Sequence, residues 1–154
     1  MSPNENANLV FLLHILNNIE QIKIYTKDIK NPNELGDIKN KRDVDATLML
    51  LTTIGELVSK LTMQLRSEYD NVQWQSIKNF RNQIVHDYFG LKLDTVYSII
   101  KNDITTLKSQ VEKIFKEKIQ KGIYNIEALM TGDGIKCHWR CGILELNATG
   151  EVKK

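Results

Sequence analysis

The chain has 154 residues, a length that fits one ordinary domain. Its formal net charge is only +2, from 21 basic and 19 acidic residues, so it lacks the strong basic bias of a dedicated duplex-binding protein. No run approaches the roughly 18 consecutive apolar residues of a membrane span, and the polar N-terminus MSPNENANLV does not resemble a signal peptide. We therefore expect a cytoplasmic protein with no membrane partner.

Apolar residues recur three and four positions apart along most of the chain, which contains only two prolines. This periodicity predicts helices over Asn8 to Lys27, Lys39 to Leu65, Trp74 to Phe89 and Thr95 to Ile119. Antiparallel helices joined by short connections form bundles, so the sequence predicts an all-α, up-and-down four-helix bundle.

Local signals refine the helix bounds. Pro32 and Gly36 break the chain between the first two helices. Gly90 is a C-terminal stop for the third helix, and Asp94 is the expected N-cap of the fourth. In the first helix, Ile22 drifts off the edge of the apolar face.

The pattern weakens after residue 119, which divides the chain into a helical domain, 1–119, and an irregular extension, 120–154. Cys137, His138 and Cys141 lie close together in this extension. Three soft ligands without a second cluster fall short of the four that structural zinc requires, so we predict neither a metal site nor a cofactor.

The stretch RNQIVHDY in the third helix combines an arginine, a histidine and a tyrosine. At about 100° per residue, Arg81 and Tyr88 fall on one line within the apolar stripe that also holds Trp74. Asn82 and His86, four residues apart, share a flank of the helix. An exposed tryptophan could stack on a base of a nucleic acid, but the position of Trp74 in the apolar stripe places it in the core instead.

An arginine inside an apolar stripe needs an anionic partner, because burying its charge alone costs several kcal/mol. Two partners are open: Glu56 of the second helix, in a structural ion pair, or a phosphate in a cleft formed with a second copy. Arginine binds phosphate with two parallel hydrogen bonds, and histidine transfers protons near neutral pH. Arg81 and His86 are the minimum for metal-free RNA cleavage, yet the same residue types also occur as structural residues at helix surfaces.

The order Arg-Asn-x-x-x-His-x-Tyr at residues 81–88 matches the signature of HEPN domains. The surrounding segments TTIGELVSKL, QWQSIKNFRNQIVHDYFGL and DTVYSII resemble the HepT family of minimal HEPN proteins, over about residues 8–115. The loop before the motif lacks the prolines common in that family, and the resemblance does not cover the extension after residue 119.

This resemblance implies a homodimer in which two motif helices face each other across a cleft. It also implies a metal-independent endoribonuclease, the toxin of a toxin–antitoxin pair. The implied partner is an MntA-type nucleotidyltransferase that neutralises the toxin by transferring AMP from ATP to the motif tyrosine.

Carried onto this chain, the resemblance makes Arg81 the residue that binds the scissile phosphate of RNA and His86 the proton-transfer residue. Asn82 would orient the phosphate or His86. Tyr88 would accept AMP.

Two carboxylates have supporting roles in this interpretation. Glu56 would pair with Arg81 or fix the second helix, while the role of Asp87 stays open between the site and an exposed helix end. A different class of function also remains: a non-catalytic helical module whose motif cleft holds a nucleotide or an arm of the nucleotidyltransferase.

Overall fold

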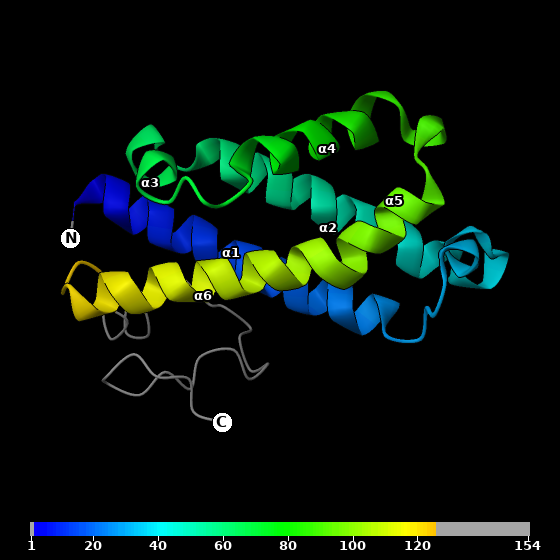
Figure 1. Ribbon diagram of the computed structural model, residues 1–154, viewed down its shortest axis with the longest axis horizontal. Helices are drawn as coiled ribbons and strands as arrows, with labels where there is room; N and C mark the ends of the chain where they lie inside the picture. The colour runs from blue at the N-terminus through cyan, green and yellow to red at the C-terminus, as the bar shows by residue number, and fades with distance from the viewer. Residues whose placement is uncertain (1, 126–154) are drawn as a thin grey trace.

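The computed structural model describes residues 2–125, and within them the chain is helical and has no strand. The bundle consists of α1 (Pro3–Thr26), α2 (Lys41–Lys60), α4 (Trp74–His86) and a last segment in which α5 (Leu93–Ser98) continues into α6 (Ile104–Gln120), as Figure 1 shows. The predicted all-α bundle is confirmed.

Helix α1 begins five residues before its predicted start. The Ser2 hydroxyl accepts a hydrogen bond from the backbone N–H of Glu5, and the Glu5 carboxylate accepts one from the backbone N–H of Ser2. This reciprocal capping box satisfies two N–H groups that helix geometry leaves without partners. A polar terminal turn with no apolar periodicity is therefore helical because of its caps.

The buried face of α1 is wider than the sequence pattern indicates. Ile22, placed at the edge of that face, is fully buried, and so is Ile15. The reason is that α1 packs against both α2 and α6, so residues on two neighbouring sides of the helix lie in the core. The helical pattern put Ile22 off the edge of the apolar face, whereas the structure places it in the core.

The predicted second helix is two helices. Helix α2 ends at Lys60, and Thr62 caps the short α3 (Met63–Glu68) by accepting from the backbone N–H of Leu65. Asn8 of α1 holds this break, since its side chain accepts from the backbone N–H of Thr62 at 3.0 Å and donates to the Thr62 hydroxyl at 2.9 Å. A contact between residues 54 positions apart thus interrupts a continuous apolar stripe.

The last segment also departs from a single α-helix. A π-helical turn, η4 (Ile99–Asp103), separates α5 from α6. Asp94 is not the N-cap; it lies in the first turn of α5, where a carboxylate favours the positive end of the helix dipole. Two 3₁₀ turns, η1 (Pro32–Gly36) and η2 (Ile38–Asn40), connect α1 to α2.

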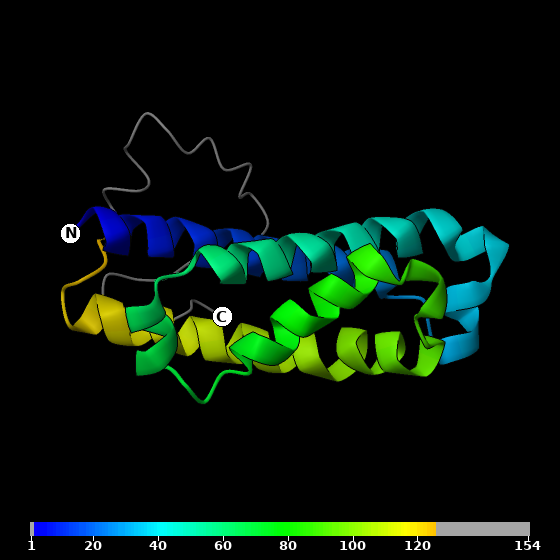
Figure 2. The same ribbon diagram turned by 90° about the horizontal axis from the view of Figure 1, so that it is seen from above.

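Helix α4 lies over α2 and runs obliquely across the bundle in Figure 2. Trp74 at its start is buried, and the indole N–H donates to the backbone carbonyl of Tyr69 at 2.9 Å. The core position expected for Trp74 is confirmed. This anchor and the packing on α2 fix where the following residues of the motif lie.

No helix in the described part of the chain is long and apolar enough to cross a bilayer. Most of the extension, including Cys137, His138 and Cys141, lies outside the described residues.

Candidate functional site

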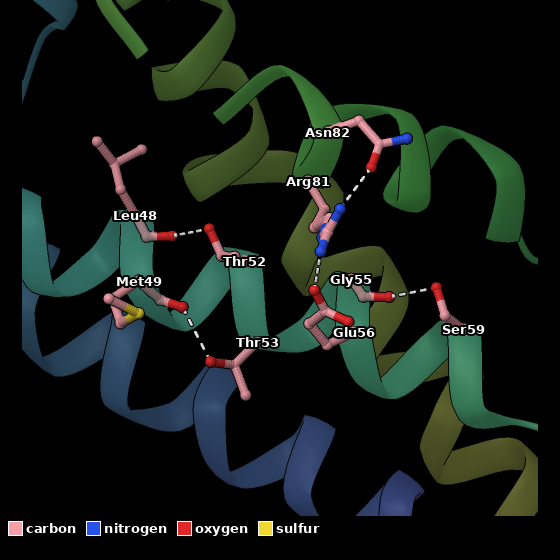
Figure 3. A network of polar contacts seen from close by, with 9 residues as sticks. All are labelled: Leu48, Met49, Thr52, Thr53, Gly55, Glu56, Ser59, Arg81 and Asn82. Carbon is pink, nitrogen blue, oxygen red and sulfur yellow. Dashed lines mark hydrogen bonds and ion pairs between the residues drawn. The ribbon is translucent and has the colours of Figure 1, made fainter. Parts of the chain in front are cut away.

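Arg81 points from α4 down to α2 (Figure 3). Its Nη2 donates to Oε1 of Glu56 in an ion pair that joins the two helices, and its Nη1 donates to the side-chain oxygen of Asn82 at 2.8 Å. Of the two partners considered from the sequence, the structure therefore shows Glu56. The Arg81 side chain as a whole is 28% exposed, so it is half-buried rather than enclosed.

Gly55 allows α4 to approach α2 at this point. A Cβ atom added at Gly55 would overlap the Cβ of Arg81 and lie 2.7 Å from its Cγ. Only a residue without a side chain fits there, and Figure 3 shows Gly55 and Glu56 beneath Arg81. The close approach is what brings the Glu56 carboxylate within reach of the guanidinium.

His86 is the last residue of α4 and is exposed to solvent. Two exposed apolar side chains lie near it in the sequence: Val85, which is 49% exposed, and Phe89, which is 99% exposed. At about 1.5 Å per residue, His86 lies roughly 7.5 Å along the helix axis from Arg81, and about 140° around it. The two side chains therefore leave the helix in different directions.

The helix ends three residues earlier than predicted because Asp87 turns the chain. Asp87 has φ −143° and ψ 54°, outside the helical region, and its carboxylate accepts a hydrogen bond from the backbone N–H of Gly90 at 3.1 Å. A Cβ on Gly90 would collide with the Asp87 carboxylate. These two residues close the 3₁₀ turn η3 (Tyr88–Gly90), so Asp87 shapes the turn that follows His86.

Tyr88 does not lie on the line of Arg81, because it has left the helix. The residue is 40% exposed, and its hydroxyl donates to Oδ1 of Asp45 on α2 at 2.6 Å. The other oxygen of Asp45 accepts from Nζ of Lys41, one helical turn earlier, at 2.8 Å. A cavity of about 230 Å³ adjoins this chain of polar groups and is lined by Lys41, Asp45 and Tyr88 together with apolar residues such as Leu91.

This chain of hydrogen bonds shifts the acidity of its members. The hydrogen bonds from Lys41 and Tyr88 lower the pKa of Asp45. The hydrogen bond to Asp45 raises the pKa of Tyr88, because deprotonation would remove the donor and place two negative charges together.

We expect the Tyr88–Asp45 bond to persist across the neutral pH range and to fail at both extremes. Because the pKa of Asp45 is depressed, its contribution is present above the unfolded value of about 3.9 and is lost as the pH falls through the lower folded value. Because the pKa of Tyr88 is raised, its contribution is fully present below the unfolded value of about 10 and is lost as the pH rises through the higher folded value.

NMR titration of ¹³C-labelled tyrosine, with Tyr88→Phe to assign the signal, measures this. Ionisation of Tyr88 below pH 10 would contradict the bond.

Sequence reasoning selected Arg81, Asn82, His86 and Tyr88, and the structure places all four in α4 or the turn that follows. Asp45 was missed, because 43 residues separate it from Tyr88 and no local pattern joins them. Its spacing of four from Lys41 is the only available signal, and that spacing is common on exposed helix surfaces. Within residues 2–125, no group of three His, Cys, Asp or Glu side chains gathers as a metal site would require.

Comparison with known proteins places this site in a family. The family model described as Ribonuclease HepT-like matches residues 15–114, which include every site residue named above. No solved structure gave a significant match.

Several curated relatives carry ribonuclease names. A Methanocaldococcus jannaschii protein named "Gamma-glutamylcyclotransferase and putative RNase" is 33% identical over 121 residues, which are 77% of this chain and 53% of the relative. The chain thus spans about half the length of that protein. Another protein of the same organism, named "Putative RNase", is 32% identical over 72% of this chain and 93% of its own length.

A Thermococcus cleftensis protein named "Probable ribonuclease HepT" is 27% identical over 69% of this chain and 94% of its own length. The family match covers most of the bundle and agrees with the motif in α4 and the turn after it. The chain belongs to the HepT-like family.

Proposed function

We propose that this chain is a metal-independent endoribonuclease and the toxin of a toxin–antitoxin pair. The observation that carries the proposal is that one helix of a HepT-like bundle holds both a fixed, half-buried Arg81 and a solvent-exposed His86. The ribonuclease names of the relatives support the substrate class. The test is cleavage of RNA in EDTA by the unmodified wild-type chain, compared with His86→Ala and Arg81→Ala.

The reaction would use the 2′-hydroxyl of the RNA as nucleophile. His86 accepts the proton of that hydroxyl while its oxygen bonds to phosphorus, and the bond from phosphorus to the 5′-oxygen breaks. The leaving oxygen takes a proton from an imidazolium, giving a 2′,3′-cyclic phosphate and a 5′-hydroxyl. Arg81 stabilises the negative charge that develops on the phosphoryl oxygens.

Glu56 and Asn82 support this role by fixing the guanidinium. Each holds one terminal nitrogen of Arg81, so the side chain loses little freedom when a phosphate arrives. Because Nε is buried, a phosphate would meet the exposed surface of the guanidinium at the terminal nitrogens Nη1 and Nη2.

We also propose that the active form is a homodimer. Arg81 and His86 diverge by about 140° around α4, so one copy does not aim both at the same phosphate. Val85 and Phe89 expose apolar surface beside His86, a surface that a second copy would cover. Two motif helices facing each other bring an arginine and a histidine together across the contact.

The partner in this proposal is an MntA-type nucleotidyltransferase that adenylylates Tyr88. The Tyr88 oxygen attacks the α-phosphorus of ATP, the bond to the pyrophosphate breaks, and the phenolic proton is released. The exposed position of Tyr88 supports this role.

Incubation with active partner and ATP is expected to add one AMP to the wild-type chain by intact mass, and none to Tyr88→Phe. Tyr97→Phe, which changes another partly exposed tyrosine, is the control and should still be modified. An unmodified wild-type chain would contradict the assignment.

A second candidate function rests on the ion pair itself. Because Glu56 already neutralises the charge of Arg81, that charge is balanced without any phosphate. In that case the chain is a non-catalytic module that binds the nucleotidyltransferase through the face around Tyr88. Tight binding of the partner with no RNA cleavage by unmodified, dimeric protein would favour this candidate.

A further inference from the structure

The turn that follows His86 makes few contacts with the rest of the bundle. Asp87 and Gly90 bond to each other within the turn, and Phe89 is almost wholly exposed. Within residues 2–125, the side-chain hydrogen bond that ties this turn to another element is the one from Tyr88 to Asp45. The position of the turn relative to α2 therefore depends on that single bond and on the packing of the half-buried Leu91.

Asp45 is well suited to hold a hydroxyl donor. Lys41 occupies one of its carboxylate oxygens at 2.8 Å, and Tyr88 occupies the other at 2.6 Å. Lys41 lies one turn earlier on the same helix, so it orients the carboxylate and keeps it charged. A hydrogen bond to a charged acceptor is stronger than one between neutral groups.

We infer that Asp45, oriented by Lys41, is a positioning residue that latches the turn carrying Tyr88 onto α2 and so fixes where His86 is presented. We further infer that a phosphoryl group on the Tyr88 oxygen opens this latch. The inference rests on the proposed function, because RNA cleavage is the activity that the latch would regulate.

The chemistry of the tyrosine oxygen gives the reason. When that oxygen bonds to phosphorus it loses its proton, so it can no longer donate to Asp45. The phosphodiester also carries a negative charge, which would stand against the Asp45 carboxylate at close range. Lys41 cannot neutralise both anions at once, so the turn moves away from α2.

Amide hydrogen exchange of residues 88–91 measures the latch without any enzymatic assay. The reporters are the N–H of Gly90, bonded to the Asp87 carbonyl at 3.1 Å, and the N–H of Leu91, bonded to the Tyr88 carbonyl at 3.4 Å. Asp45→Ala and Tyr88→Phe should each raise their exchange rates by about three- to tenfold, as loss of one solvent-exposed hydrogen bond would do. The double variant should exchange no faster than either single variant, because both remove the same bond.

Three matched variants separate a latch from general damage. Asp45→Asn keeps an oxygen that accepts from Tyr88, so it should restore most of the protection. Tyr97→Phe removes a similar hydroxyl bond, to the carbonyl of Lys30, and should leave residues 88–91 unchanged. Asp43→Ala removes a carboxylate from the same end of α2 that pairs with Arg42, and should also leave them unchanged.

The same variants connect the latch to the site. Asp45→Ala should lower kcat for RNA cleavage several-fold with little change in KM, and Asp45→Asn should recover it. Unchanged exchange in Asp45→Ala, or additive effects in the double variant, would overturn the inference. If exchange responds as expected while the wild-type chain cleaves no RNA, the latch stands and the ribonuclease proposal fails.

Discussion

Replacement of His86 by alanine is expected to lower RNA cleavage in EDTA by about 100- to 10,000-fold, the usual contribution of a proton-transfer group. His86 is exposed at the end of α4, so its removal leaves no cavity and should not change the thermal unfolding midpoint. His14, an exposed histidine of α1, supplies the matched control. His14→Ala should cleave RNA at the wild-type rate.

Arg81→Ala belongs in the same experiment. It is expected to cost about 100- to 1,000-fold in kcat, comparable to loss of one charge-stabilising donor. Arg81→Lys should recover only part of this, since a lysine supplies charge without the planar fork.

Intact mass must show that the protein is unmodified at Tyr88. Cleavage by His86→Ala at the wild-type rate would contradict the mechanism, while cleavage abolished by EDTA would contradict its independence from metal.

Replacement of Gly55 by alanine is expected to have the largest effect on stability. The added methyl group overlaps the stem of Arg81, so α4 must shift away from α2. Overpacking of this kind typically costs about 1–3 kcal/mol. For a chain of this size, that lowers the unfolding midpoint by roughly 2–4 °C for each kcal/mol.

Gly36→Ala is the control for this change. A Cβ at Gly36 would meet Leu93 at 3.4 Å, an ordinary contact, so the unfolding midpoint should stay close to that of the wild type. Gly55→Ala should also weaken RNA cleavage, because shifting α4 separates Arg81 from Glu56. An unchanged unfolding midpoint in Gly55→Ala would show that the two helices are not packed as described.

The bundle itself was predictable because helical periodicity is a local property. The stripe of α2, which includes Leu48, Ile54 and Val58, is buried as its spacing predicts. The same reasoning failed where contacts with other helices decide which residues are buried and where a helix ends. Ile22 is buried because two helices flank α1. Helix α2 ends at Lys60 because the side chain of Asn8 accepts a hydrogen bond from the backbone N–H of Thr62.

The motif at residues 81–88 likewise contains residues that local spacing placed correctly and one that it did not. Spacing placed Arg81, Asn82 and His86 on one helix correctly, since all three precede the helix end. It misplaced Tyr88, because the helical projection was carried past Asp87, whose carboxylate bonds Gly90 and ends the helix. A short side chain that bonds the backbone locally thus outweighed the helical pattern.

The sequence by itself determined the helical class, the core stripes and the family, because these follow from periodicity and from a motif that is local in the chain. Only the tertiary structure decided which group neutralises Arg81 and which group receives the hydroxyl of Tyr88. Those partners, Glu56 and Asp45, are 25 and 43 residues away. The reason is physical: Gly55 lets α4 approach α2 closely enough for Glu56 to reach Arg81, and the turn at Asp87 takes Tyr88 out of the helix to Asp45.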